Sequence, residues 1–227
     1  MPIEFDLDKI VHHKRDLTSG YHLMMGRGWR IIGEQDRLHS PLAYSAFEYR
    51  CSIERIMIEL FVLVRDKKIS KTDLRTMNSI SNVRKAIYQT FGEKKQFERT
   101  QIFNRLYSQG NNSPPEIWIA IVDIELLEKY WSKLSEYCHR QLKPHETWES
   151  MGNQWLINGY KLLNEVETYL WSINVTSHVG WVQPSTMQPE MREALKEFVS
   201  GRILQSTLET RLTIMGPIIK KRVHGRY

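Results

Sequence analysis

An apolar stripe between residues 42 and 63 constrains the fold more strongly than any other feature of the sequence. Successive members are four or three residues apart, and they are Leu42, Ala46, Tyr49, Ile53, Ile56, Leu60 and Leu63. This spacing aligns all of them on one face of an α-helix. The second half of the segment, IMIELFVLV, is apolar on almost every side. We therefore predict a central buried helix that begins at Ser40-Pro41 and runs to about Arg65.

Glu59 is the single acidic residue in the apolar half of this helix. Because a buried carboxylate is costly unless it is paired, we expect a basic partner for it on a neighbouring helix. The same reasoning predicts that the apolar side chains around it are almost completely inaccessible to solvent, namely those of Ile53, Ile56, Leu60 and Leu63.

The rest of the chain also follows helical periodicity. A second long helix is predicted from Ser113-Pro114-Pro115 to about Arg140, with Ala120 in its apolar stripe. Pro144 stops this helix, and Thr147 is the predicted N-cap of a third long helix. Shorter helices are expected over residues 21–35, 72–91, 94–107 and 189–199, whereas the end of the chain is either a helix or an extended arm.

These patterns predict an all-α protein. No segment shows the alternation of polar and apolar residues that is typical of a half-buried strand. We expect a helical bundle with long core helices over residues 1–180. Residues 181–227 are predicted to form a C-terminal helix and a basic tail that pack on the bundle or extend from it.

Composition and targeting signals indicate where such a protein works. The chain has 227 residues, of which 41% are hydrophobic, enough for one sizeable core. We find no signal peptide and no run that approaches a membrane span of roughly 20 apolar residues. The two cysteines do not form a disulfide framework for a chain of this size. The sequence therefore predicts a soluble, cytoplasmic protein that has no membrane partner.

Positive charge is concentrated at the end of the chain. The net charge is +6, and the segment from Arg202 onward carries six basic residues against one acidic residue, Glu209. A basic segment in an otherwise nearly neutral chain suits a polyanion such as RNA. The candidate phosphate contacts are Lys220, Lys221 and Arg222. The alternative is a solvated end that keeps the protein in solution.

Several classes of catalytic site have no support in the sequence. Neither a GxxxxGK[ST] phosphate loop nor a GxGxxG motif is present. The chain also lacks a CxxC pair and an HExxH motif, which are frequent sources of zinc ligands. We therefore predict that the protein uses no metal and no cofactor.

Chemically suitable residues gather where the second long helix is predicted to end. Glu128, Ser132, Ser135 and His139 recur at helical spacing as a polar stripe beside the apolar one. Arg140 and His145 follow, and then the next helix begins. The free N–H groups at a helix N-terminus can bind an anion.

Two histidines, an arginine and a helix N-terminus are suited to metal-free cleavage of RNA. One histidine can activate the ribose 2′-hydroxyl and the other can protonate the leaving oxygen. A fixed positive charge stabilises the transition state. In the alternative interpretation, His139 only caps the end of its helix, whereas Arg140 and His145 are exposed loop residues.

At these residues the sequence resembles the HEPN superfamily. The segment from Arg140 to His145, RQLKPH, is similar to the R-x(4–6)-H signature, and LSEYCH at 134–139 is similar to an L-S-x-Y-x-H segment of HEPN-like bacterial proteins. The resemblance implies a helical bundle, a homodimer and a metal-independent ribonuclease. It implies that Arg140 and His145 are the catalytic pair, or that His139 with Ser135 occupies the equivalent groove. Gln141 and Lys143, within the motif, are candidate substrate contacts together with Ser135.

Two functional hypotheses follow from this resemblance. In the first, the protein cleaves or binds RNA as a toxin or an antiphage effector. In the second, it is a catalytically inactive bundle that binds a protein partner, such as an antitoxin, in a defence or regulatory complex. The two differ in whether Arg140, His139 and His145 converge on one pocket.

Overall fold

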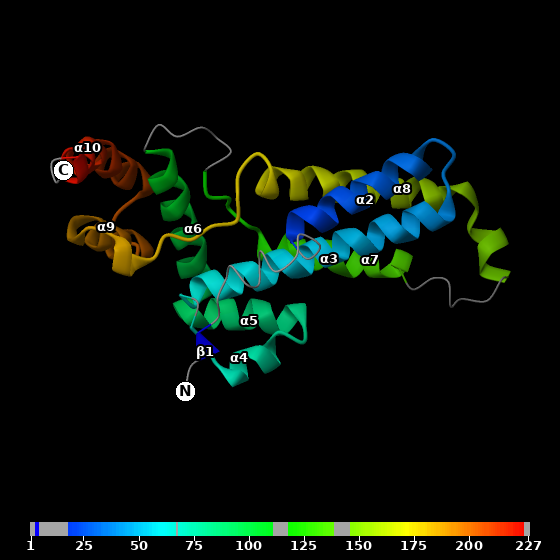
Figure 1. The fold of residues 1–227 in the computed structure, drawn as a ribbon, viewed down its shortest axis with the longest axis horizontal. Helices are drawn as coiled ribbons and strands as arrows, with labels where there is room; N and C mark the ends of the chain where they lie inside the picture. Colours follow the sequence, from blue (N-terminus) through cyan, green and yellow to red (C-terminus); the bar gives the residue numbers. More distant parts are fainter. Residues whose placement is uncertain (1–2, 5–17, 67, 111–117, 139–145, 225–227) are drawn as a thin grey trace.

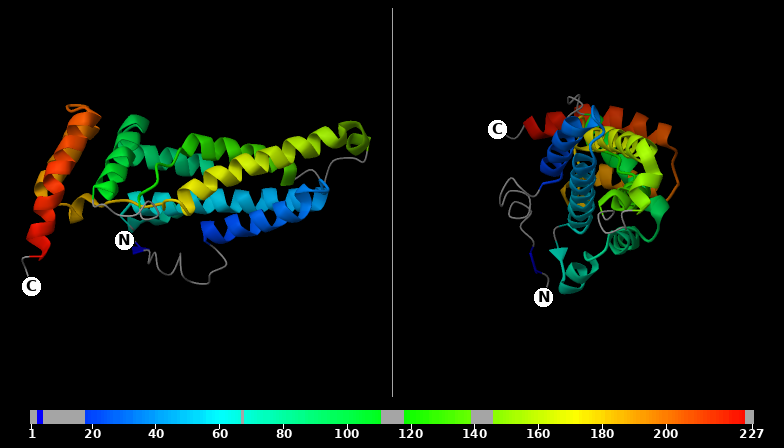
Figure 2. Two further views of the ribbon diagram at one scale, coloured as in Figure 1. Left: turned by 90° about the horizontal axis from the view of Figure 1, so that it is seen from above. Right: turned by 90° about the vertical axis from the view of Figure 1, so that its right-hand side faces the viewer.

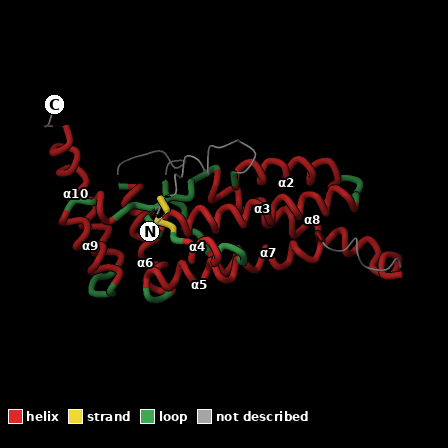
Figure 3. Tube along the Cα trace, turned by 60° about the horizontal axis from the view of Figure 1, so that its bottom comes forward, coloured by secondary structure: helices red, strands yellow, loops and turns green. Residues whose placement is uncertain are grey.

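The computed structural model describes residues 3–4, 18–66, 68–110, 118–138 and 146–224. It confirms the predicted all-α class, since the described chain is mainly helical and its only strands are two residues long (Figures 1 and 3). These strands, β1 (Ile3–Glu4) and β2 (Lys68–Ile69), pair antiparallel. Four long helices lie side by side, and they are α2 (Ser19–Glu34), α3 (His39–Val64), α7 (Ile124–Cys138) and α8 (Glu146–Asn174).

Helix α3 is the central helix of the bundle, as the apolar stripe predicts. It packs against α2, α7 and α8. Ile53, Ile56 and Leu60 are completely or almost completely buried, whereas Leu63 is only half-buried, contrary to the prediction. The helix also begins two residues before the predicted Pro41, after Leu38. The hydroxyl of Tyr160 in α8 donates to the Leu38 carbonyl at 2.6 Å and so fixes this entry.

The glycines of α2 permit close packing rather than interrupting the helix. The predicted helix at 21–35 is confirmed as α2, and the Thr18 hydroxyl caps it by accepting from the Tyr21 N–H at 3.1 Å. A Cβ at Gly26 would overlap the ring of Tyr49, and one at Gly33 would overlap the Tyr160 hydroxyl. These two residues are therefore glycine because tyrosine rings from α3 and α8 occupy the space.

The partner of Glu59 is not the basic side chain that the sequence suggested. Its carboxylate accepts from the backbone and the hydroxyl of Ser19, the first residue of α2, with Oγ to Oε2 at 3.3 Å. Burial raises the pKa of Glu59, and these hydrogen bonds oppose the rise together with the charge of Arg55, one turn earlier in the same helix. The positive end of a helix dipole thus takes the place of a basic residue on a neighbouring helix.

A buried charged cluster joins α2 to α3 and α8. The Arg30 guanidinium donates to Glu167 at 2.6 Å and also pairs with Glu34. The hydroxyl of Tyr49 donates to the same Glu167 carboxylate. Both Arg30 and Glu167 are largely buried. Removing one member would leave the opposite charge buried and unpaired, so the cluster fixes how α2 packs on α8.

Helix α7 begins later than the sequence predicted. Residues 118–123 are extended, and the backbone of Ala120 donates to the His178 carbonyl at 2.8 Å. The side chain of Gln101 bonds both backbone groups of Val122. The Asp123 carboxylate then caps the helix by accepting from the Leu126 N–H at 2.9 Å. Ala120 matches the helical spacing, but it is buried as part of an extended segment.

The remaining helices form two further groups. The prediction of a single helix over residues 72–91 is wrong. The Ser79 hydroxyl caps a new helix by accepting a hydrogen bond from the Asn82 N–H. The segment divides into α4 (Lys71–Thr76) and α5 (Ile80–Phe91). A second core lies among α6 (Lys94–Gln109), α9 (Pro189–Val199) and α10 (Gln205–His224) at one end of the molecule (Figure 2). The helix predicted at 189–199 is confirmed, and the chain is helical again from Gln205 to His224.

Candidate functional site

The structure describes both flanks of the predicted catalytic junction but not its centre. Helix α7 ends at Cys138 and α8 begins at Glu146. The predicted catalytic and contact residues between them lie outside the described part of the chain, and they are His139, Arg140, Gln141, Lys143 and His145. Thr147 is not an N-cap, because α8 begins one residue before it. An acidic residue such as Glu146 is favoured in the first turn by the helix dipole.

An aromatic cluster joins α7 to α8 near the junction. The ring of Tyr137, the penultimate residue of α7, lies 4.8 Å from the Trp155 ring in α8. The His39 ring, at the start of α3, stacks on Trp155 with its centroid 5.1 Å away. The end of α7 therefore contacts α8 at the end of the bundle where α2 turns into α3 (Figure 1). His39 had not been selected from the sequence, because nothing in its local pattern links it to residue 155.

The polar stripe on α7 leads along the helix toward this junction. Ser132 is exposed, and Glu128 pairs with Arg84 of α5 at 2.5 Å. The hydroxyl of Ser135 donates to the carbonyl of Trp131 at 2.8 Å, so its proton is used within its own helix. A hydroxyl that donates one hydrogen bond still has acceptor capacity. Ser135 can therefore accept a hydrogen bond from a ligand, whereas it is a poor donor.

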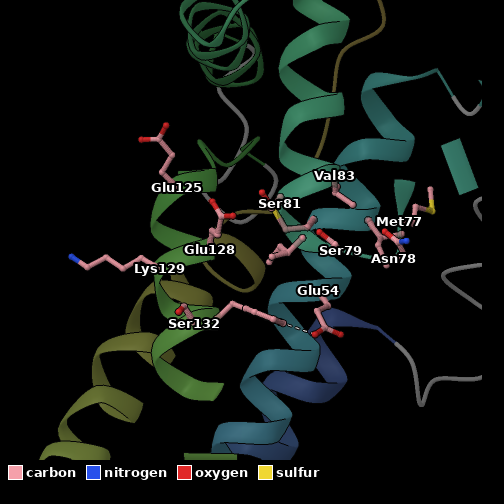
Figure 4. Close-up of a pocket in the computed structure, with 14 residues that line it drawn as sticks. Glu54, Met77, Asn78, Ser79, Ser81, Val83, Glu125, Glu128, Lys129 and Ser132 are labelled. Atoms are coloured by element: carbon pink, nitrogen blue, oxygen red, sulfur yellow. Dashed lines mark hydrogen bonds between the residues drawn. The ribbon is translucent and has the colours of Figure 1, made fainter. Parts of the chain in front are cut away.

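A groove of about 670 Å³ lies beside the first half of α7. Its walls come from α3, from the start of α5 and the connection before it, and from α7 (Figure 4). Apolar side chains such as Met57, Ile58 and Val83 contribute much of its lining, and Ser79, Ser81 and Ser132 add hydroxyl groups. This volume lies within the range of small-molecule sites. The spacing of Glu128 and Ser132 along one helix can be found from the sequence, but the groove cannot, since its walls are remote from one another in the chain.

The carboxylates of the groove already have partners. Glu54 accepts from the Trp131 indole at 2.7 Å, the hydrogen bond drawn in Figure 4, and lies 3.6 Å from Arg50. Glu125 pairs with Lys94 at 2.6 Å, as Glu128 does with Arg84. The Lys129 chain extends away from Glu54 and Ser132 (Figure 4). The groove therefore offers apolar contacts and hydrogen-bond acceptors, and it is poorly suited to a phosphate.

The cysteine at the end of α7 is not an activated nucleophile. Cys138 and Cys51 are both free and half-buried. Burial raises the pKa of Cys138, and it raises that of Cys51 to about 11 with help from Glu54 and Glu48. Because the thiolate is the reactive form, both groups are poor nucleophiles near neutral pH.

Three candidate phosphate contacts of the basic segment belong to α10. Lys220, Lys221 and Arg222 lie within the bounds of this helix, but their side chains are outside the described set. Earlier in α10, Leu208 and Leu212 are buried in the second core, and Arg211 pairs with Glu197 of α9. The described half of the helix is thus anchored by its apolar side chains.

Metal sites, membrane segments and relatives give no further indication of function. Among the described residues, no group of three or more His, Cys, Asp and Glu side chains could hold a metal ion. None of the described helices has both the length and the hydropathy that a membrane crossing requires. No family model, curated protein or solved structure matches this chain.

Proposed function

We propose that the protein is an HEPN-like RNA-cleaving or RNA-binding protein whose site is the connection between α7 and α8. One observation carries the proposal: the contact between Tyr137 and Trp155 joins the two helices whose connecting sequence contains an arginine and two histidines. The polar stripe of α7 runs toward the same connection. In this role the protein acts as a toxin or an antiphage effector that attacks RNA in the cytoplasm.

The proposed reaction is an acid–base cleavage that uses the ribose itself as nucleophile. One of His139 and His145 removes the proton of the 2′-hydroxyl, which attacks the adjacent phosphate. The second histidine protonates the 5′-oxygen that leaves, so the products carry a 2′,3′-cyclic phosphate and a 5′-hydroxyl. Arg140 stabilises the additional negative charge on the phosphate in the transition state.

The proposal includes a homodimer and contacts to RNA outside the reacting phosphate. Ser135, Gln141 and Lys143 contact the RNA next to the reacting group, and Lys220, Lys221 and Arg222 attract its backbone. Charge supports the second contribution, since the segment from Arg202 onward carries six basic residues and one acidic residue.

RNA cleavage by the purified protein in the presence of a chelator tests the proposal. We expect cleavage with 2′,3′-cyclic phosphate ends, and its loss in Arg140→Ala. Arg192→Ala is the matched control, because Arg192 is an exposed arginine on α9. Cleavage that requires a divalent metal, or that persists unchanged in Arg140→Ala, would contradict the mechanism.

The groove favours a second function, that of an inactive bundle that binds a protein partner. Its apolar lining, paired carboxylates and hydroxyl groups suit a peptide better than a nucleic acid backbone. If the wild-type protein cleaves no RNA, this function becomes the better account.

A further inference from the structure

The outward face of α2 is unusual for a surface helix because it is apolar. Its exposed residues are Tyr21, Met24, Met25, Gly28, Ile31 and Ile32, and none of them is charged. Ile31 and Ile32 are 57% and 60% exposed. Within the described chain, the α2–α3 hairpin contains eight of the twelve exposed large hydrophobic residues, and the other four are scattered over separate elements.

The charged residues of α2 point the opposite way. Arg30 and Glu34 take part in the cluster around Glu167, and Arg27 lies 3.5 Å from the same carboxylate. Arg27 also stacks over Trp171 of α8 at 4.7 Å. A helix at the surface of a monomer normally turns its charges to water and its apolar side to the core. Helix α2 does the reverse, which indicates that another surface covers its outer face.

The apolar residues of α2 are arranged symmetrically about Gly28. Met24 and Met25 precede it by four and three residues, and Ile31 and Ile32 follow it by three and four. A Cβ at Gly28 would have nothing within 4 Å, so this point of the helix is open to close approach. A twofold axis through Gly28 would set Met24 opposite Ile32 of an antiparallel copy, and Met25 opposite its Ile31. Such a self-complementary pattern is what an isologous interface needs.

The size of the apolar face also fits a dimer. Tyr44 of α3 lies beside α2, with its ring 5.0 Å from the Trp29 ring, and Phe47, one turn further along α3, is also exposed. At about 200 Å² for a fully exposed large side chain, the eight exposed residues of the hairpin, including Leu38 just before α3, present at most roughly 800 Å². That is about the area that one partner contributes to a stable protein interface. The partly exposed charges of α2, Arg27 and Glu34, are paired with Glu167 and Arg30 and lie outside this apolar face.

We infer that the outer face of the α2–α3 hairpin is the interface of a homodimer, with α2 packed antiparallel against its copy across Gly28. The inference goes beyond the proposed function and does not depend on RNA cleavage, because a twofold axis through Gly28 places the two α7–α8 connections at opposite ends of the dimer. The occupant is a second copy rather than a different protein because the pattern is symmetric about one residue.

The mass of the full chain in solution, measured by light scattering after gel filtration, tests this inference. The wild type is expected at twice the 27.0 kDa chain mass. The double variant Met24→Glu, Ile32→Glu should be monomeric, with an unchanged helical circular dichroism spectrum. Leu204→Glu is the matched control, since Leu204 is 72% exposed but lies outside the hairpin, and it should remain dimeric.

A mixing experiment tests the antiparallel arrangement itself. Met24→Glu alone and Ile32→Lys alone should each dimerise poorly, because a charge faces an apolar residue twice in each homodimer. Their mixture should recover the dimer, since the carboxylate introduced in one chain then faces the ammonium group introduced in the other.

A monomeric wild type would overturn the inference, whatever its effect on RNA. A folded double variant that remains dimeric would also overturn it, because the interface would lie elsewhere. A mixture that stays monomeric would overturn the antiparallel register. RNA cleavage, measured separately on the same proteins, reports on the proposed function and not on the interface.

Discussion

The groove and the junction lie along the same helix, α7, yet they differ in the chemistry they offer. In the groove, Glu54, Glu125 and Glu128 each have a basic partner, and apolar side chains contribute much of the lining. The junction sequence after Cys138 contains an arginine, a lysine and two histidines and has no acidic residue before Glu146. Cavity size alone therefore does not identify a site for a polyanion. The groove has the volume, whereas the junction has the charge.

The largest expected effect is on the rate of RNA cleavage, which should depend on the junction and not on the groove. If the protein cleaves RNA, His145→Ala should lower the rate by about 10²–10⁴-fold, the usual contribution of an acid–base group. Ser132→Ala, on the groove wall, should leave the rate within a factor of about two. Single-turnover cleavage of a labelled RNA gives both rates. Equal losses in the two variants would remove the distinction between the sites.

The variant His139→Ala shows which of the two histidines takes part in RNA cleavage. Loss of cleavage in both histidine variants supports an acid and a base at the junction. If only His139→Ala is inactive, the LSEYCH segment carries the chemistry and the R-x(4)-H match is a coincidence. His178→Ala is the matched control, because His178 is exposed and lies near the other end of α8.

The second effect concerns α3, which forms a wall of the groove and the centre of the bundle. Leu60→Ala should lower the free energy of unfolding by about 2–5 kcal/mol, because it leaves a cavity in the core. Leu63→Ala should cost roughly 1–2 kcal/mol, since its side chain is only half-buried. Urea unfolding followed by circular dichroism gives both values. A loss below about 1 kcal/mol for Leu60→Ala would show that α3 is not the central helix.

A smaller effect on stability tests how closely α2 packs against α3 in the hairpin. Gly26→Ala should destabilise the fold by about 1–3 kcal/mol, because the new methyl group overlaps the Tyr49 ring. Gly28→Ala has open space and should be neutral or stabilise the helix by up to about 1 kcal/mol. Both are measured by thermal unfolding in the monomeric Met24→Glu, Ile32→Glu background, so that no dimer contact contributes. Equal effects would contradict the described approach of α2 to α3.

The smallest effect concerns the basic residues near the end of the sequence. Deletion of residues 218–227 removes four basic residues, namely Lys220, Lys221, Arg222 and Arg226. If they contact phosphates, the slope of log affinity against log salt should become shallower by up to about 3 units. Filter binding over a salt series measures the slope. An unchanged slope would mean that the segment only carries solvated charge.

The parts of the fold that could be predicted from the sequence are those that depend only on residue spacing within one helix. The stripe of α3 is periodic and all of its members except Leu63 are buried, so the periodicity alone identified it. Ala120 has the same spacing, but backbone hydrogen bonds to His178 hold its segment extended. Local periodicity carries no information about that distant pairing. Glu59 shows the same limit, because its partner is the end of another helix.

The same distinction applies to the two candidate sites, the junction and the groove. The polar stripe on α7 could be found from spacing, because Glu128, Ser132 and Ser135 share one helix face. The groove could not, because Glu54, Ser79 and Ser132 meet only after three separate segments have packed. The arrangement of His139, Arg140 and His145 lies outside the described residues, so their convergence stays a prediction.

Hydrogen–deuterium exchange with a bound RNA would decide whether the junction, rather than the groove, receives the polyanion. The RNA carries 2′-deoxy substitutions, so that it binds without being cleaved. We predict slower exchange in peptides that cover residues 133–148 and unchanged exchange in peptides that cover residues 77–83 of the groove. Slower exchange at residues 77–83 with no change at 133–148 would contradict the assignment of the junction as the RNA site.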